Sequence, residues 1–201
     1  GGKGASLATL SQAGFPVPSA VIIPTSVFEQ FLKTSRLDRT IGTIRSHIDP
    51  QDLNNIEQSA RAIQSLFVQT PLPEDLQQEV EQAFTALGST TVAVRSSATA
   101  EDATSTSWAG ELETLLNVRK ESIVHAIKKC WASLFSARAL LYRHTKHLDQ
   151  MPISVAVVIQ TMLESEVAGV CFTVHPVTND STQMIIEAGW GLGEAVVGGL
   201  I

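Results

Sequence analysis

The stretch VAVRSSATAED, residues 92–102, joins an apolar run to a polar segment with no glycine or proline between them. The apolar residues predict a strand over 91–95 that ends at Arg95. A guanidinium at a strand end, beside hydroxyl groups and backbone amides, suits a polyphosphate, because arginine binds phosphate oxygens in a bidentate manner. A second interpretation stays open, in which Arg95 pairs with Glu101 or Asp102 and only ties down the loop.

Two glycine-rich segments flank this stretch. GGKGAS, residues 1–6, lacks the spacing of a P-loop, because Gly4 follows Lys3 directly. A lysine at a glycine-flanked helix start still favours an anion, since its ammonium adds to the helix dipole and the exposed amides. The alternative is a flexible terminus with a stray lysine. AGWGLGE, residues 188–194, begins like a dinucleotide fingerprint, but Val196 stands where the third glycine would be. It predicts a tight glycine turn, either beside the site or needed for close packing.

Composition excludes several classes of protein. The 201 residues are 44% hydrophobic and 17% charged, values typical of a soluble globular protein. No apolar run approaches the roughly 20 residues that span a bilayer, so no membrane partner is expected. A net charge of −6 disfavours nucleic-acid binding. Cys130 and Cys171 lack a metal-like spacing and predict buried free thiols in a reducing, cytoplasmic compartment, with a disulfide between them as the alternative. The histidines form no ligand cluster, and His175 is expected to be structural or at the surface.

Basic residues concentrate in residues 119–147, which hold seven of the fourteen lysines and arginines and one acid, Glu121. Three interpretations are open for this segment: a solvated helix face, a wall facing phosphate, or a docking surface for an acidic domain.

Apolar periodicity predicts helices over 55–69, 74–87 and 121–146, after an N-terminal helix that ends near Gly14 and another capped by Thr25 or Ser26. Runs of β-branched residues predict strands over 20–23, 91–95, 112–118, 153–163, 167–174 and 183–188. Because helices come first and antiparallel-looking strands later, the order predicts an α+β fold with a helix-rich N-terminal part and a mostly antiparallel C-terminal sheet.

Three long spans together resemble a known family. GGKGASLATLSQAGFPVPSAVIIPTSVFEQFL, VAVRSSATAEDATSTSWAGELETLLNV and VVIQTMLESEVAGVCFTVHPVT…IIEAGWGLGEAVVGGL are similar to the nucleotide-binding domain of the phosphoenolpyruvate synthase and pyruvate phosphate dikinase family, which rifampicin phosphotransferases share. The resemblance implies an ATP-grasp fold, in which two α+β lobes clamp ATP with Mg²⁺. The approximate lobes would be residues 1–118 and 119–201.

The resemblance also implies a reaction. The β-phosphoryl group of ATP would pass to a histidine on a separate swivelling domain, for onward transfer to pyruvate in phosphoenolpyruvate synthesis. In rifampicin phosphotransferases the acceptor is the drug. Neither the swivelling domain nor an acceptor site matches any part of this chain. Carried over by motif, Lys3 and Arg95 would contact the ATP phosphates and act in catalysis, and Gly110 would offer its backbone to them with Thr114 nearby. Residues bordering the adenine would be Gln160, Met162 and Leu163.

The chain also departs from the family pattern. It stops at Ile201, so the domain is expected to be incomplete at both ends, with the metal ligands beyond residue 201. Residues 103–107 differ from the family loop, and Glu111 stands where the family has a glutamine. The isolated chain is therefore expected to be weakly active or inactive. A truncated, non-catalytic nucleotide-binding or docking module, with the basic helix as its docking face, is the alternative.

Overall fold

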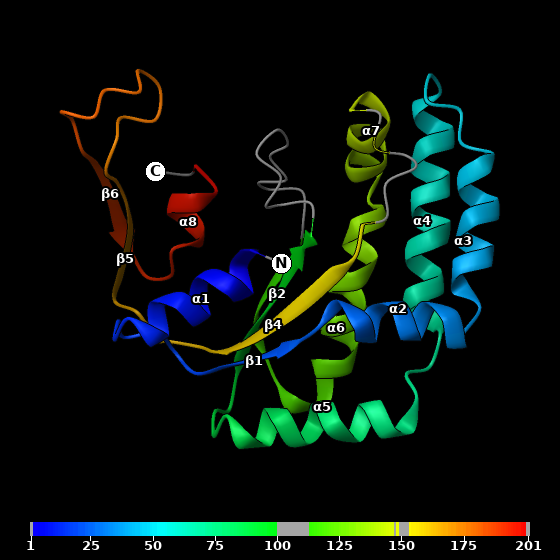
Figure 1. Cartoon of the computed structure of the whole chain (residues 1–201), viewed down its shortest axis with the longest axis horizontal. Helices are drawn as coiled ribbons and strands as arrows, with labels where there is room; N and C mark the ends of the chain where they lie inside the picture. Colours follow the sequence, from blue (N-terminus) through cyan, green and yellow to red (C-terminus); the bar gives the residue numbers. More distant parts are fainter. Residues whose placement is uncertain (1, 100–112, 147, 149–152, 200–201) are drawn as a thin grey trace. The chain divides into compact units, whose positions relative to one another are not determined.

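The computed structural model describes residues 2–99, 113–146, 148 and 153–199. It combines helices with antiparallel sheet, as the predicted α+β class requires. Two compact units divide the chain, Gly1–Met162 and Leu163–Ile201 (Figure 1). The predicted lobe boundary near residue 118 falls inside the first unit.

A four-stranded sheet forms the centre of the first unit, in the order β1-β4-β2-β3. All three pairings between these strands are antiparallel. Because β4 comes late in the sequence yet pairs with both β1 and β2, it ties the residues after 119 to the N-terminal elements. The strands are β1 (Ala20–Ile23), β2 (Val92–Ala98), β3 (Thr114–Val118) and β4 (Val155–Thr161).

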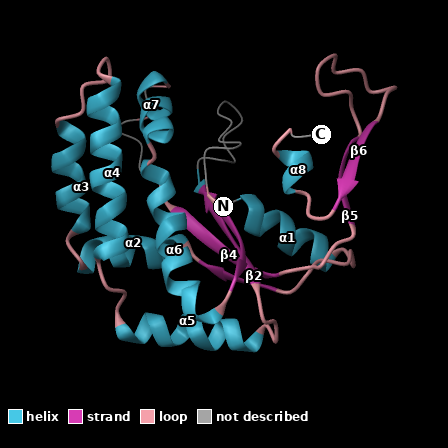
Figure 2. Ribbon diagram, turned by 180° about the vertical axis from the view of Figure 1, so that it is seen from behind, coloured by secondary structure: helices cyan, strands magenta, loops and turns pink. Residues whose placement is uncertain are grey.

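One face of this sheet packs on a helical layer. Alternate residues of the strands, such as Val94, Val157 and Ile159, are fully buried in the hydrophobic core on this side. Five aromatic rings of the core contact one another between the helices, with the Phe31 and Trp131 centroids 5.1 Å apart. In the layer, α3, α4 and α7 stand side by side (Figures 1 and 2). Its helices are α2 (Thr25–Thr34), α3 (Leu37–Ser46), α4 (Leu53–Gln69), α5 (Glu74–Ala86), α6 (Ile123–Ala132) and α7 (Ala137–Thr145).

The opposite face of the sheet is covered by α1 (Gly2–Gln12). The two layers approach closely at Gly4, because a Cβ placed there would lie 3.0 Å from Ile22 Cδ1. A larger residue at this position would require the Ile22 side chain to shift by a few tenths of an ångström. The chain leaves α1 through Gly14, whose φ of 80° is a left-handed conformation that glycine adopts without strain.

Three local predictions were wrong. The helix expected over 121–146 breaks into α6, a 3₁₀ turn over Ser133–Phe135 and α7, because the Ser136 hydroxyl accepts from the Ala139 amide and caps a new helix. Neither Thr25 nor Ser26 caps α2, since Pro24 occupies the cap position without a side-chain hydrogen bond. Finally, β2 runs to Ala98, so that Arg95 lies in mid-strand and not at its end.

The second unit is a two-stranded antiparallel sheet with one short helix. Its elements are β5 (Val167–Phe172), β6 (Ile185–Trp190) and α8 (Glu194–Val197). The AGWGLGE segment turns at Gly191, whose φ is 82°, as the predicted glycine turn requires. His175 accepts from the amides of Val177 and Thr178 at 3.2 Å, a structural role in the loop between the strands. Cys171 is free but exposed, which corrects the expectation that both thiols are buried.

Candidate functional site

Strand β2 presents two different sets of side chains to the two faces of the sheet. Successive residues of a strand point to opposite sides. Val92, Val94 and Ala98 belong to the core cluster, so the residues that alternate with this set, Ala93, Arg95 and Ser97, face α1. The polar segment that looked like a loop in the sequence is therefore part of a strand with one polar face.

Neighbouring strands add residues to the same face. Arg95 is the cross-strand partner of Thr114 on β3 and of Val158 on β4. Gln160 pairs with Ala93, two residues before Arg95. Because directly paired residues project to the same side, Arg95, Thr114 and Gln160 share the face that α1 covers.

Helix α1 brings Lys3 to this face. The backbone amide of Lys3 donates to Ser97 Oγ at 3.2 Å, although the two residues are 94 positions apart. Lys3 lies in the first turn of α1, where the helix dipole is positive and the amides have no intrahelical acceptor. Four residues named from the sequence, Lys3, Arg95, Thr114 and Gln160, thus come from three strands and one helix to a single face.

The Arg95 side chain is half-buried on this face. Among the residues that the structure describes, its guanidinium has no hydrogen-bond or ion-pair partner. The competing interpretation pairs Arg95 with Glu101 or Asp102, and those two residues lie outside the described residues, as does Gly110. A cationic group of this kind, with five donors in a rigid fork, is suited to a phosphate or carboxylate.

The adenine-side residues have different surroundings. The Gln160 side chain is buried, and its Nε2 donates to the Pro18 carbonyl at 3.3 Å, which fixes the amide. The Met162 amide donates to the Thr91 carbonyl at 3.3 Å, just beyond the end of β4. Leu163 is exposed and begins the second unit.

Behind the face, a network on the core side anchors the start of β3. The Glu113 carbonyl accepts from the amide and the hydroxyl of Ser96, at 3.1 and 2.7 Å, and the Cys130 thiol approaches it at 3.9 Å. Burial raises the pKa of Cys130 to about 12, the Glu113 charge adds to the increase, and the Lys3 ammonium opposes it. The thiol therefore stays protonated, and its role is structural.

Ser97 was missed as a residue of the candidate face, and Ser96 as part of the network on the core side. The sequence analysis placed both in a polar loop after the strand, and no local signal contradicts that interpretation. The one available clue is the alternation of VAVRSSA itself, in which small residues continue the period of two through Ala98.

The basic segment 119–147 contains both buried and exposed cations. Lys128 and Arg143 are buried, whereas Lys120, Lys129 and Lys146 are exposed on separate elements. Arg119 and Arg138 are exposed as well, so five cations of the segment reach the surface. The docking interpretation of this segment stays a prediction.

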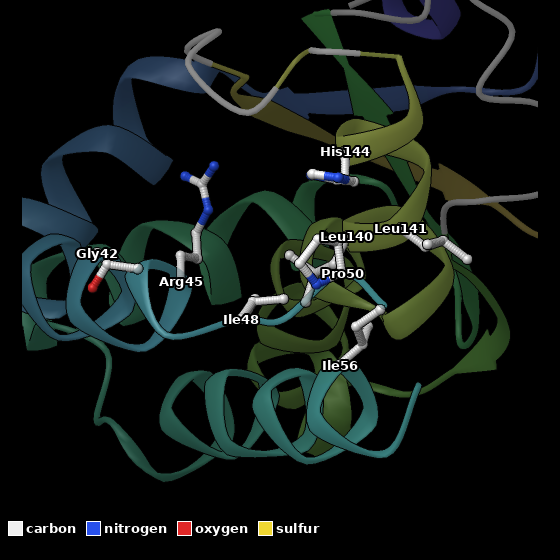
Figure 3. Close-up of a pocket in the computed structure, with 9 residues that line it drawn as sticks. Gly42, Arg45, Ile48, Pro50, Ile56, Leu140, Leu141 and His144 are labelled. Atoms are coloured by element: carbon white, nitrogen blue, oxygen red, sulfur yellow. The ribbon is translucent and has the colours of Figure 1, made fainter. Parts of the chain in front are cut away.

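Two cavities in the described surface lie away from the sheet face that α1 covers. One of about 390 Å³ opens between α3, the loop after it, α4 and α7. Arg45 and His144 stand on opposite sides of it, with Ile48 and Leu140 between them (Figure 3). A second, of about 570 Å³, lies between α4 and α6. Neither is lined by Lys3, Arg95, Thr114 or Gln160, so the candidate site rests on strand register and hydrogen bonds.

Within residues 2–99, 113–146, 148 and 153–199, no three or more His, Cys, Asp or Glu side chains gather where they could hold a metal ion. In the same ranges, every helix is too short or too polar to cross a bilayer.

Comparison with known proteins identifies the family. Residues 1–201 match the family model described as pyruvate phosphate dikinase, AMP/ATP-binding domain. All of this chain aligns with the probable phosphoenolpyruvate synthase of Methanothermobacter thermautotrophicus at 39% identity, covering 30% of that relative. The probable phosphoenolpyruvate synthase of Archaeoglobus fulgidus is 41% identical, with 27% of its length covered.

The phosphoenolpyruvate synthase of Aeropyrum pernix is 38% identical to this chain, with 26% of its length covered. The chain therefore spans less than a third of the length of these relatives. Since the family model covers the chain from end to end, the chain belongs to the family of pyruvate phosphate dikinase AMP/ATP-binding domains.

Proposed function

We propose that this chain binds ATP on the sheet face under α1, as part of a phosphotransferase that resembles phosphoenolpyruvate synthase. The observation that carries the proposal is the shared face of Lys3, Arg95, Thr114 and Gln160. The family resemblance implies that these four residues lie at or near the bound nucleotide. Two cations on one face match the charge of a polyphosphate.

Each residue has a role that its position supports. Lys3, in the first turn of α1, and Arg95, in mid-strand, would bind and orient the ATP phosphates and neutralise charge during transfer. Thr114 would lie beside Arg95, and Gly110 would add its backbone. Gln160, Met162 and Leu163 would border the adenine. Mg²⁺ would accompany the phosphate oxygens, which it commonly prefers as ligands.

The reaction proposed for the whole protein extends beyond this chain. In an ATP-grasp arrangement with lobes near 1–118 and 119–201, the β-phosphoryl group would pass to a histidine on a separate swivelling domain, and from there to pyruvate. The names of the relatives favour pyruvate, and no relative reported above supports rifampicin as the acceptor. The chain by itself would bind ATP without turning it over. Its two free cysteines are compatible with a cytoplasmic location.

Thermal unfolding in the presence of MgATP tests the proposal. At a ligand concentration of about 100 times the Kd, binding should add about 2.7 kcal/mol to the free energy of unfolding. For a chain of this size that corresponds to a rise in melting temperature of roughly 5–10 °C. Lys3→Ala and Arg95→Ala should each reduce the affinity roughly tenfold or more, because a hydrogen-bonded charge is lost.

Matched controls remove the same charges elsewhere. Lys33, on α2, and Arg39, on α3, are both exposed, so Lys33→Ala and Arg39→Ala should leave the MgATP shift unchanged. No shift for the unaltered chain, or equal shifts for the site variants and these controls, contradicts the proposal.

A further inference from the structure

The hydroxyl group of Ser97 stands where α1 meets the sheet. It accepts the hydrogen bond from the Lys3 amide at 3.2 Å, and the Ser97 side chain is fully buried. The first amides of a helix need acceptors from outside the helix. Ser97 supplies one from a strand that lies 94 residues away, so it caps α1 through tertiary structure and not through the local sequence.

The same hydroxyl links the two cations of the candidate site. Ser97 and Arg95 are two residues apart on β2 and point to the same face, about 6–7 Å apart along the strand. The residue that holds the Lys3 backbone is therefore fixed on the strand that carries Arg95. A ligand that contacts both cations gains affinity when their separation is set before it binds, because less ordering is then required.

On the basis of the proposed ATP site, we propose that Ser97 is a positioning residue for ATP. By holding the Lys3 amide, it fixes the Lys3 backbone relative to β2, which restricts the positions of the ammonium to those from which it and the Arg95 guanidinium reach one polyphosphate. Ser97 acts through Lys3. It differs in this from Ser96, whose hydroxyl donates to the Glu113 carbonyl at 2.7 Å on the opposite side of the strand.

Ser96 and Ser97 are adjacent on β2 and point to opposite faces of the sheet, so their alanine variants form a matched pair. Both are buried, Ser96 to 1% and Ser97 to 0% exposure, and each loses one hydrogen bond on substitution by alanine. MgATP affinity should be measured by calorimetry, below the unfolding transition, for Ser97→Ala, Ser96→Ala, Lys3→Ala and Lys3→Ala/Ser97→Ala. Ser97→Ala should weaken binding roughly fivefold to tenfold, and Ser96→Ala should change it less than twofold.

The double variant separates positioning from general loosening of the structure. If Ser97 acts through Lys3, removing its hydroxyl from the Lys3→Ala chain should weaken binding less than twofold further. If the effect of Ser97→Ala were purely structural, it would weaken MgATP binding equally in the unaltered chain and in the Lys3→Ala chain. Hydrogen exchange without nucleotide gives a second measurement: in Ser97→Ala, the first-turn amides of α1 should exchange faster, while the amides of β4 keep their protection.

Three results overturn the inference. They are unchanged MgATP affinity in Ser97→Ala, a Ser97→Ala loss of the same size in both backgrounds, and unchanged exchange at the Lys3 amide. The proposed function fails separately, when Lys3→Ala and Arg95→Ala both bind MgATP as the unaltered chain does. A Ser97→Ala defect beside a Lys3→Ala variant that binds MgATP normally also overturns the inference, because Ser97 would then not act through Lys3.

Discussion

The Lys128 ammonium lies 2.6 Å from the backbone oxygen of Val68, in the last turn of α4. A second hydrogen bond, at 3.0 Å, joins it to the Thr70 carbonyl. Carbonyls at the end of a helix have no intrahelical donor. Lys128 is 9% exposed, and burial lowers the pKa of its ammonium group. One of the seven cations of the basic segment therefore serves as a cap for a neighbouring helix.

Lys128→Met should destabilise the chain, because it keeps most of the apolar stem but removes both hydrogen bonds. The expected loss is about 1–3 kcal/mol of unfolding free energy, since two carbonyls would lose a charged donor. Urea denaturation measures it. Lys129→Met, at the next and exposed position, should change the value by less than about 0.5 kcal/mol. Equal losses in the two variants would show that Lys128 does not act as a cap.

Gly4→Ala should change the unfolding free energy differently in the unaltered chain and in an Ile22→Val chain. Alanine favours a helix over glycine by up to about 1 kcal/mol, but its Cβ would lie 3.0 Å from Ile22 Cδ1. In the unaltered chain, this contact should cancel the gain or reverse it. In Ile22→Val, which lacks the Cδ1 atom, Gly4→Ala should raise the unfolding free energy by roughly 0.5–1 kcal/mol. The same change in melting temperature in both backgrounds would contradict the close approach.

Elements with a complete local pattern could be predicted from the sequence. The strand over 20–23 and the helices over 55–69 and 74–87 agree with β1, α4 and α5 within a few residues, because their apolar spacing repeats over several turns or pleats. Helix α3 was not predicted, although Leu37, Ile41 and Ile44 have helical spacing. The chain turns into α3 at Arg36, whose φ of 58° is a left-handed conformation in which glycine is the usual residue, so the sequence carries no glycine that would indicate the turn.

Features that depend on distant partners could not be predicted in this way. Ser96 and Ser97 stay in β2 because the Glu113 carbonyl and the Lys3 amide satisfy their hydroxyls. Neither partner is close in sequence. For the candidate site, the family resemblance supplied the residue names, and the register of β2, β3 and β4 supplied their common face.

Gln160→Ala should reduce the preference for ATP over GTP, if Gln160 borders the base as proposed. Its Nε2 donates to the Pro18 carbonyl, which holds the amide so that Oε1 is available as an acceptor. Adenine carries an exocyclic amine where guanine carries an oxygen, so an acceptor there favours adenine. The Kd for GTP divided by the Kd for ATP should fall by roughly tenfold. Met162→Leu, which keeps the apolar contact, should preserve the ratio, and an unchanged ratio in Gln160→Ala excludes this role.

The two cysteines should differ in reactivity. Cys130 is buried with a pKa of about 12, whereas Cys171 is exposed. Iodoacetamide reacts with thiolates, so in the folded chain at pH 8 it should label Cys171 and spare Cys130. Mass spectrometry after brief labelling checks this. Both cysteines should react in urea, and rapid labelling of Cys130 in the folded chain would mean that α6 opens from the sheet.

Burial of Cys130 should also make the chain less stable at alkaline pH. In the unfolded chain this thiol ionises near its ordinary pKa of 9.0, but in the folded chain only near 12. Between these values the folded state binds the extra proton, so the unfolding free energy falls as pH rises, by up to roughly 4 kcal/mol. Cys130→Ala removes this contribution, and urea denaturation from pH 8 to 11 should show a flatter decline than in Cys171→Ala. Parallel declines in the two variants would mean that Cys130 ionises as easily in the folded chain as in the unfolded one.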